Sequence, residues 1–135
     1  MRTVTAAHVA MYRGSRGKLG SRMGRMPVLL LTTTGRKSGK PRTTPLSYVE
    51  DRGSFVLAAS NGGNPWFPSW YHNLKARPAA TVQTGAQRMQ VAARVATAAE
   101  RERLWPKFVE GFKGYESYAA KTSRPIPLVI LTPEL

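Results

Sequence analysis

The sequence contains no cysteine, only two histidines and only seven acidic residues among its 135. The absence of cysteine excludes a disulfide scaffold, an iron–sulfur cluster and thiol catalysis. The two histidines and the scattered acidic residues show no metal-ligand spacing, so neither a metal site nor a metal hydrolase is expected. No serine stands in a Gly-x-Ser-x-Gly sequence, which argues against a serine hydrolase. If the protein is an enzyme, a bound cofactor is expected to carry the chemistry.

Long apolar stretches are also missing. No uninterrupted aliphatic run is longer than Val28 to Leu31, which is far too short for a transmembrane helix. The N-terminus lacks the apolar core of a signal peptide, so a cytoplasmic location is expected. The length and the hydrophobic share of 41% predict one compact domain with a real core, not a disordered chain.

Positive charge is what the sequence has in excess. Lys and Arg number 21 and Asp and Glu number 7, which gives a formal net charge of +14. The charge is unevenly placed, because ten basic residues precede Glu50, the first acidic one. Such one-sided charge indicates an anionic partner. A phosphorylated small molecule, an anionic membrane surface and nucleic acid are all consistent with it.

The apolar pattern divides the chain into a basic N-terminal segment, residues 1–26, and a periodic domain, residues 27–135. The segment combines a predicted helix over residues 3–13 with a flexible stretch rich in Gly and Arg. In the domain, Asp51-Arg52-Gly53 and Gly85 mark hairpin turns. Strands are expected at residues 28–33, 43–49, 55–59, 80–84, 88–95 and 128–131, and helices at residues 69–75 and 97–112.

Neighbouring hairpins without strand–helix–strand alternation predict a mainly β, α+β fold. The antiparallel sheet is expected to curl into a small barrel with helices outside it. Pro45 marks its strand as an edge or bulged strand, because proline cannot donate to a ladder. Thr97 and Glu100 form a capping box for the last helix, and Pro106 is expected to kink or interrupt that helix.

The turn after the first strand, Gly35 to Arg42, has the composition of a phosphate-binding loop. Its two glycines let the backbone approach a ligand, and four cations and a serine surround them. The spacing excludes a P-loop, since Gly35 and Gly39 stand one residue too close and a strand follows. The alternative interpretation is a solvated basic hairpin tip.

Two later clusters are further candidates for a site. Residues 58–65 end a strand in small side chains and open into a Gly-Gly turn, which would let a flat ring lie against the backbone; a plain glycine turn is the alternative. Residues 66–74 hold four aromatic side chains, much of which we expect in the core. His72 in this cluster is a weak candidate for an acid or base.

A third cluster consists of Phe112, Tyr115 and Tyr118. On a helix, aromatic residues at this spacing form one stripe. The stripe is either a packing surface or a lid over a pocket. Lys113 and Gly114 indicate an exposed, flexible segment and therefore favour the lid.

Three strings carry a specific resemblance to a known family: LLLTTTGRKSGKPRTTPLSYV, AASNGGNPWFPSWYHNLKARP and WPKFVEGFKGYESY. These strings, in this order, make residues 28–135 resemble the deazaflavin-dependent nitroreductases and quinone reductases of mycobacteria and other actinobacteria. That family uses coenzyme F-420, an 8-hydroxy-5-deazaflavin with a phosphodiester and a polyglutamate tail. The resemblance implies a split β-barrel, similar to FMN-binding barrels. It also implies an oxidoreductase that transfers a hydride from the reduced cofactor to a quinone, a nitro compound or an enone.

The resemblance also assigns residues to the site. The basic turn would hold the phosphate and tail, and the strand after it would run beside the cofactor. Ser60 or Tyr115 would donate a hydrogen bond to the acceptor oxygen, where negative charge develops. The implied cofactor-binding residues are Arg36, Lys37, Ser38, Arg42, Thr43, Thr44, Pro45, Leu46, Ser47, Ala58, Ala59, Ser60, Asn61, Ser69, Trp70, Tyr71, His72, Asn73 and Tyr115, and the implied substrate-facing residues are Ser47, Phe112, Tyr115 and Tyr118.

Other interpretations remain open. A similar barrel could bind FMN, since both cofactors have a phosphate and a tricyclic ring. A nucleic-acid-binding module is disfavoured, because the cations are not interleaved with exposed aromatic residues. The cations of residues 13–25 have no local partner. They predict peripheral contact with an anionic inner membrane surface, where each basic residue contributes about 1 kcal/mol. The oligomeric state is not indicated.

Overall fold

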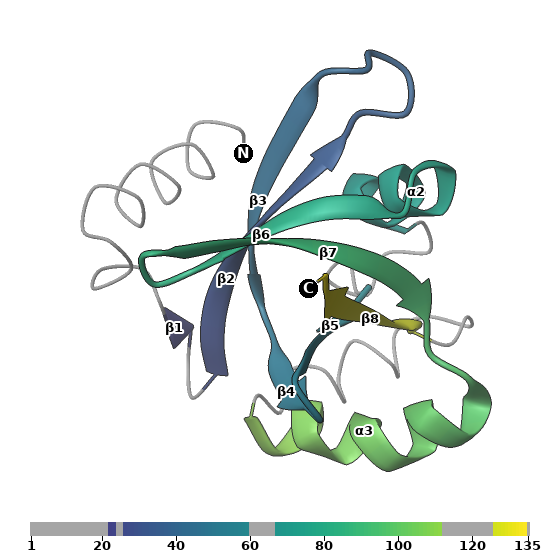
Figure 1. Cartoon of the computed structure of the whole chain (residues 1–135). Coiled ribbons are helices and arrows are strands. Elements are labelled where there is room, and N and C mark those ends of the chain that lie inside the picture. The colour runs from purple at the N-terminus through teal and green to yellow at the C-terminus, as the bar shows by residue number, and fades with distance from the viewer. Residues whose placement is uncertain (1–21, 24–25, 60–66, 112–125, 135) are drawn as a thin grey trace.

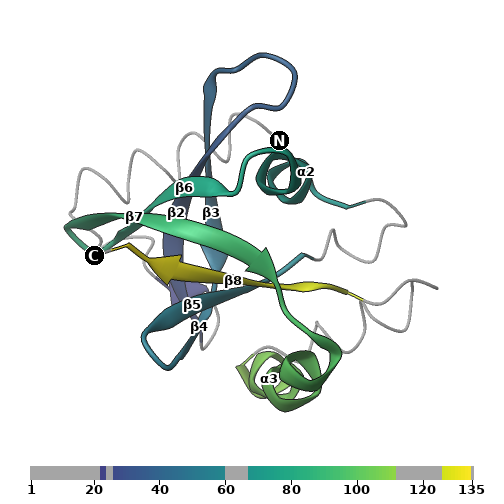
Figure 2. The same cartoon turned by 45° about the vertical axis from the view of Figure 1, so that its right-hand side comes forward.

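The computed structural model describes residues 22–23, 26–59, 67–111 and 126–134. In this part of the chain, eight antiparallel strands form one strongly curled sheet, and two helices lie at opposite ends of it (Figures 1 and 2). The strand order is β1-β2-β6-β7-β8-β5-β4, and β3 also pairs with β2. The elements are β1 (Arg22–Met23), β2 (Met26–Thr34), β3 (Pro41–Ser47), β4 (Val49–Asp51), β5 (Ser54–Ala58), α2 (Ser69–Ala76), β6 (Ala79–Thr84), β7 (Gln87–Val95), α3 (Ala98–Gly111) and β8 (Leu128–Pro133).

The curled antiparallel sheet with flanking helices confirms the predicted fold, but one expected strand is wrong. Residues 43–49 form a corner, not a single strand: β3 pairs with β2, and β4 pairs with β5. Tyr48 makes the corner, because its backbone N–H donates to the carbonyl of Pro27 at 3.1 Å. Its buried ring packs edge-on against Phe55 with centroids 5.4 Å apart. The chain therefore changes its pairing partner at Tyr48.

Two local predictions about the strands are confirmed. Pro45 lies in β3, which within the described residues pairs only with β2 and is therefore an edge strand. The β4–β5 hairpin turns at Arg52 and Gly53, whose φ angles are 51° and 82°. Two successive positive φ angles match the right-handed twist of the flanking strands. Arg52 is the only described non-glycine residue with a positive φ.

The core consists of two main clusters that share the same sheet. Phe55 and Leu57 of β5 contribute to the cluster inside the curl, together with α2. Val56 and Ala58, on the other face of β5, pack against α3. Successive side chains of a strand point to opposite faces, so a strand covered on both faces is apolar at every position. This explains why β5 is apolar and buried from Phe55 to Ala58.

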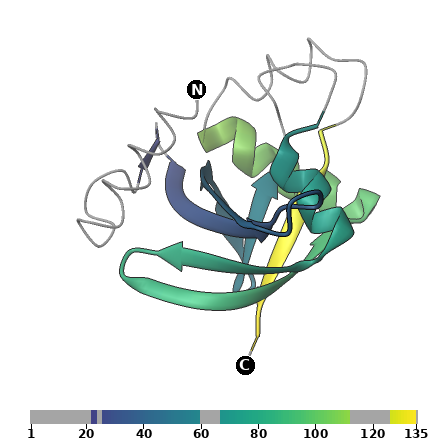
Figure 3. The ribbon, with the colours of Figure 1, turned by 90° about the horizontal axis from the view of Figure 1, so that it is seen from above.

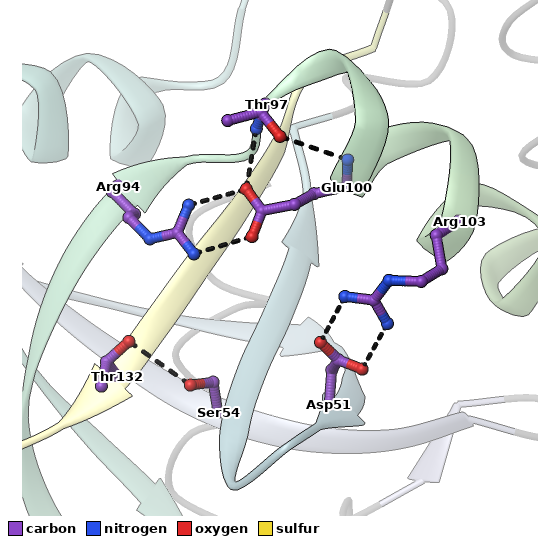
Figure 4. A network of polar contacts seen from close by, with 7 residues as sticks. All are labelled: Asp51, Ser54, Arg94, Thr97, Glu100, Arg103 and Thr132. Atoms are coloured by element: carbon purple, nitrogen blue, oxygen red, sulfur yellow. Dashed lines mark hydrogen bonds and ion pairs between the residues drawn. The ribbon is translucent and has the colours of Figure 1, made fainter.

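Helix α3 begins with the predicted capping box. The Thr97 N–H donates to Glu100 Oε1 at 2.9 Å, and the Glu100 N–H donates to Thr97 Oγ1 at 3.2 Å (Figure 4). The helix then continues from Ala98 to Gly111 without the interruption expected at Pro106. Pro106 and Glu102 are both exposed, so water can reach the carbonyl that proline leaves without a donor.

Two bidentate ion pairs attach α3 to the sheet. Arg94 of β7 binds both carboxylate oxygens of Glu100 at 2.7 and 2.8 Å. Arg103 binds Asp51 at the end of β4 at 2.8 and 3.0 Å (Figure 4). The hydrogen bond from Arg103 lowers the pKa of Asp51. The carboxylates of Glu100 and Asp51, near α3, are therefore already paired with arginines.

The Arg94–Glu100 pair makes stability depend on acid pH. Hydrogen bonds from Arg94, and then from the Thr97 backbone, lower the pKa of Glu100 from 4.5 to about 2. The unfolded chain thus binds this proton at a higher pH than the folded one. The contribution is complete above the unfolded pKa and is lost as the pH falls towards 2. We expect the Tm of the wild type to fall more steeply below pH ~5 than that of Glu100→Gln, measured by circular dichroism.

The control for this experiment is Glu102→Gln, which removes an exposed carboxylate from the same helix. This variant should follow the wild-type curve. The Tm difference between wild type and Glu100→Gln should disappear as the pH approaches 2. If Tm depended on pH in the same way for wild type and Glu100→Gln, the ionised Glu100 would have no role in stability.

Candidate functional site

The basic turn, residues 35–42, joins β2 to β3 at the top of Figure 1. Its backbone closes on itself: the Gly35 N–H donates to Lys40 O, and the Gly39 N–H donates to Gly35 O, both at 2.8 Å. Gly39 has a φ of +70°, which favours glycine. A Cβ on Gly35 would lie 2.6 Å from Ser38 Oγ, so a side chain there would displace the serine. Both glycines of the predicted loop are therefore needed for its shape.

Ser38 organises the inside of the turn. Its Oγ accepts hydrogen bonds from the Lys40 N–H at 3.2 Å and from Arg42 Nη2 at 3.5 Å. These bonds hold the Arg42 side chain at the foot of the turn. Ser38 and Arg42, both predicted as cofactor-binding residues, are thus brought together by the fold.

The cations of the turn are exposed and lack a carboxylate. In the ranges that the structure describes, no acidic side chain forms an ion pair with them, whereas Asp51 and Glu100 pair with arginines near α3. Exposed cations without a partner attract anions, and arginine binds phosphate or carboxylate in a bidentate manner. The cations are Arg36, Lys37, Lys40 and Arg42.

Helix α2 fixes the turn from the side. Asn73 of α2 accepts hydrogen bonds from the Arg36 N–H at 3.1 Å and from Arg36 Nη1 at 3.3 Å, and it donates to Thr33 Oγ1 of β2 at 3.1 Å. In the view from above, the tip of the β2–β3 hairpin lies next to α2 (Figure 3). Arg36 and Asn73, both predicted site residues, are therefore in direct contact.

The predicted cofactor strand has two faces, because side chains of β3 alternate. Thr44 lies opposite Leu31 and Leu46 lies opposite Leu29, so both share the face of the inner core cluster. Thr43, Pro45 and Ser47 lie on the other face, where Thr43 Oγ1 is 2.8 Å from Thr32 Oγ1. Because the side chains of β3 point to two faces, they cannot all contact the same ligand. A ligand that touches every one of these residues would have to lie along the edge of the strand.

The aromatic residues of α2 are largely core residues, as expected. Trp70 is 6% exposed and Tyr71 8%, and both pack in the cluster inside the curl. His72 is half-buried, with ring centroids 5.9 Å from Phe67 and 5.9 Å from Tyr71. Ser69, at the helix start, is exposed. Of this predicted group, Ser69 and His72 therefore remain accessible to a ligand.

The small residues at the end of β5 are buried as well. Ala58 packs in the α3 cluster and Ala59 in the inner cluster. The Ala59 N–H already donates to Pro127 O at 2.9 Å. Five of the predicted residues lie outside the described residues, and their roles stay predictions: Ser60, Asn61, Phe112, Tyr115 and Tyr118.

The sequence did not single out Thr33, although it contacts Asn73 of the candidate site. Its side chain is 2% exposed and accepts the hydrogen bond from Asn73. The sequence did carry a signal for Thr33: it is a polar residue at an inward-facing, alternate position of an otherwise apolar strand.

The described residues contain no group of three or more His, Asp or Glu suited to a metal ion. No helix of the described ranges is long and apolar enough to cross a membrane.

The curled antiparallel sheet with its flanking helices has the architecture of a split β-barrel. Among solved structures, the chain superposes on an F420-H2 dependent reductase (FDR-A) with a TM-score of 0.72 and 45% identity, over 78% of this chain and 93% of that one. A protein solved as a domain-swapped dimer gives a TM-score of 0.74 with 39% identity, over 93% and 92% of the two chains.

The family follows from the sequence comparisons. The family model for F420H(2)-dependent quinone reductase matches residues 4–133. An F420H(2)-dependent quinone reductase of Mycobacterium tuberculosis is 44% identical over 129 residues, which cover 93% of this chain and 87% of the relative. The chain belongs to the F420H(2)-dependent quinone reductase family. The predicted family and cofactor are thereby confirmed.

Proposed function

We propose that this protein binds reduced coenzyme F-420 and reduces a quinone. The family match over residues 4–133 carries this proposal. The structure supports it with an exposed basic turn that has no carboxylate partner in the described part of the chain. A nitro compound or an enone is a further acceptor predicted from the sequence. Membrane contact through residues 13–25 also stays a prediction, because it falls almost entirely outside the described residues.

The residues present fit a cofactor with a phosphate and a chain of carboxylates. Arg36 and Arg42 would bind the phosphodiester, because each is held at the turn by a side-chain hydrogen bond and keeps further N–H donors. Lys37 and Lys40 would bind the acidic tail as point charges. When bound, the deazaflavin would supply a hydride from its C5, and a quinone accepting the hydride would also take up one proton to become a hydroquinone.

The protein's own contribution is positioning and charge stabilisation. Holding the cofactor by its tail fixes where the ring can lie relative to the acceptor. Ser60 or Tyr115 is proposed to donate a hydrogen bond to the quinone oxygen, which becomes negative as the hydride arrives.

Binding and turnover together test this function. We expect the purified protein to bind F-420 and to oxidise its reduced form only when menadione is present, followed by the cofactor's absorbance. FMN should bind far more weakly in the same titration. A reaction without protein corrects for direct reduction of menadione. Tight FMN binding with no binding of the deazaflavin would replace this proposal by the flavoprotein alternative.

A further inference from the structure

Asn73 is one of three polar residues that are buried in the described part of the chain, with 4% exposure. A buried amide without partners is costly, so its hydrogen bonds indicate why it is there. Its side chain does not cap its own helix. It joins Thr33 of β2 to Arg36 of the basic turn, which lie 40 and 37 positions away in the sequence.

The pattern of donors fixes the orientation of this amide. Asn73 Oδ1 accepts from two N–H groups of Arg36, and Nδ2 donates to Thr33. The opposite orientation would place an NH₂ group against two N–H donors. One oxygen therefore holds both the backbone and the guanidinium of Arg36. This double contact restricts the Arg36 side chain although the residue is exposed.

We propose that Asn73 is a positioning residue that holds Arg36 ready for the anionic part of the cofactor. The inference rests on the proposed function and deepens it. Both lone pairs of Asn73 Oδ1 are occupied by Arg36, so the oxygen is not available to a ligand. Arg36 has five N–H donors and uses one on Asn73, which leaves four for a phosphate or carboxylate.

The contact with Asn73 lowers the entropy that Arg36 loses when it binds an anion. A free arginine side chain loses rotamer entropy when it binds an anion, and a side chain already held in place loses less. Asn73→Ala should therefore weaken binding of whole F-420 about threefold to tenfold, the range expected for immobilising one such side chain. Binding of the deazaflavin core without phosphate and tail should not change, because Arg36 does not contribute to it.

A double-mutant cycle separates this role from direct contact. Affinities for F-420 and for the core are measured by fluorescence titration for wild type, Asn73→Ala, Arg36→Ala and the double variant. We expect Asn73→Ala to add less than about twofold once Arg36 is alanine, because coupled residues are not additive. Additive losses, or equal weakening of core and whole cofactor, would mean that Asn73 contacts the cofactor or only stabilises the fold.

Two variants complete the experiment. Arg88→Ala removes an exposed cation elsewhere in the sheet and should leave both affinities near wild type. Thr33→Val removes the acceptor for Asn73 Nδ2 at nearly constant volume. It serves as the second test if Asn73→Ala does not fold, and it should weaken only whole F-420. A wild type that does not bind F-420 rejects the proposed function itself, whereas unchanged affinity for F-420 in both Asn73→Ala and Thr33→Val rejects only the positioning role.

Discussion

Replacing Arg36 and Arg42 together by alanine is expected to weaken binding of F-420 at least about 100-fold. A hydrogen bond to a charged group contributes about 1.5–3 kcal/mol, so two lost contacts amount to about 3 kcal/mol or more. Both side chains lie exposed at the basic turn, and neither has an ion-pair partner in the described residues. The KM for reduced F-420 should rise while kcat at saturation changes little, because the lost contacts lie away from the reacting atoms.

The matched control removes two cations from other hairpins. Arg52→Gly suits the positive φ of that position, and Arg88→Ala changes an exposed strand residue. This double variant has the same net charge as the first but keeps the basic turn. Its affinity for F-420 should stay within a few-fold of wild type, as measured by fluorescence titration. An equal loss in both double variants would show that overall charge, not the turn, attracts the cofactor.

Local signals in the sequence predicted local structure well. The capping box at Thr97 and Glu100 and the turn at Arg52 and Gly53 each depend on residues within four positions of one another. Their hydrogen bonds and φ preferences act whatever the rest of the chain does. The composition of the basic turn likewise indicated exposed cations, and the structure shows them exposed and without a carboxylate partner in the described ranges. That they bind an anion stays a prediction.

Features that depend on distant partners could not be predicted in the same way. Residues 43–49 all suit a strand, and only the separate pairing of β3 with β2 and of β4 with β5 creates the corner at Tyr48. The contact between Asn73, Arg36 and Thr33 joins three elements of the fold. The resemblance indicated that Arg36 and Asn73 belong to one site. It did not indicate that they bind each other, which decides whether Asn73 is a ligand or a support.

The α3 cluster carries the largest stability prediction. Phe108 is fully buried between α3 and the sheet, packed with Leu104 and with residues of β5 and β8. Phe108→Ala should cost about 3–5 kcal/mol, since it removes the ring and leaves a cavity. A typical domain has only about 5–15 kcal/mol of stability, so this is a large share. We expect the Tm to fall by about 10–15 °C for a chain of this size, measured by thermal unfolding and checked by urea titration.

Phe108→Leu and Val109→Ala are the matched controls for the stability loss in Phe108→Ala. Phe108→Leu keeps most of the apolar volume and should cost much less than Phe108→Ala. Val109 is half-buried on the same helix, so its truncation should also be mild. The cluster lies on the face of β5 and β8 opposite the inner core, so F-420 affinity at 25 °C should persist in the folded Phe108→Ala protein. A Tm loss in Phe108→Ala no greater than in Val109→Ala would mean that α3 does not form a cooperative unit with the sheet.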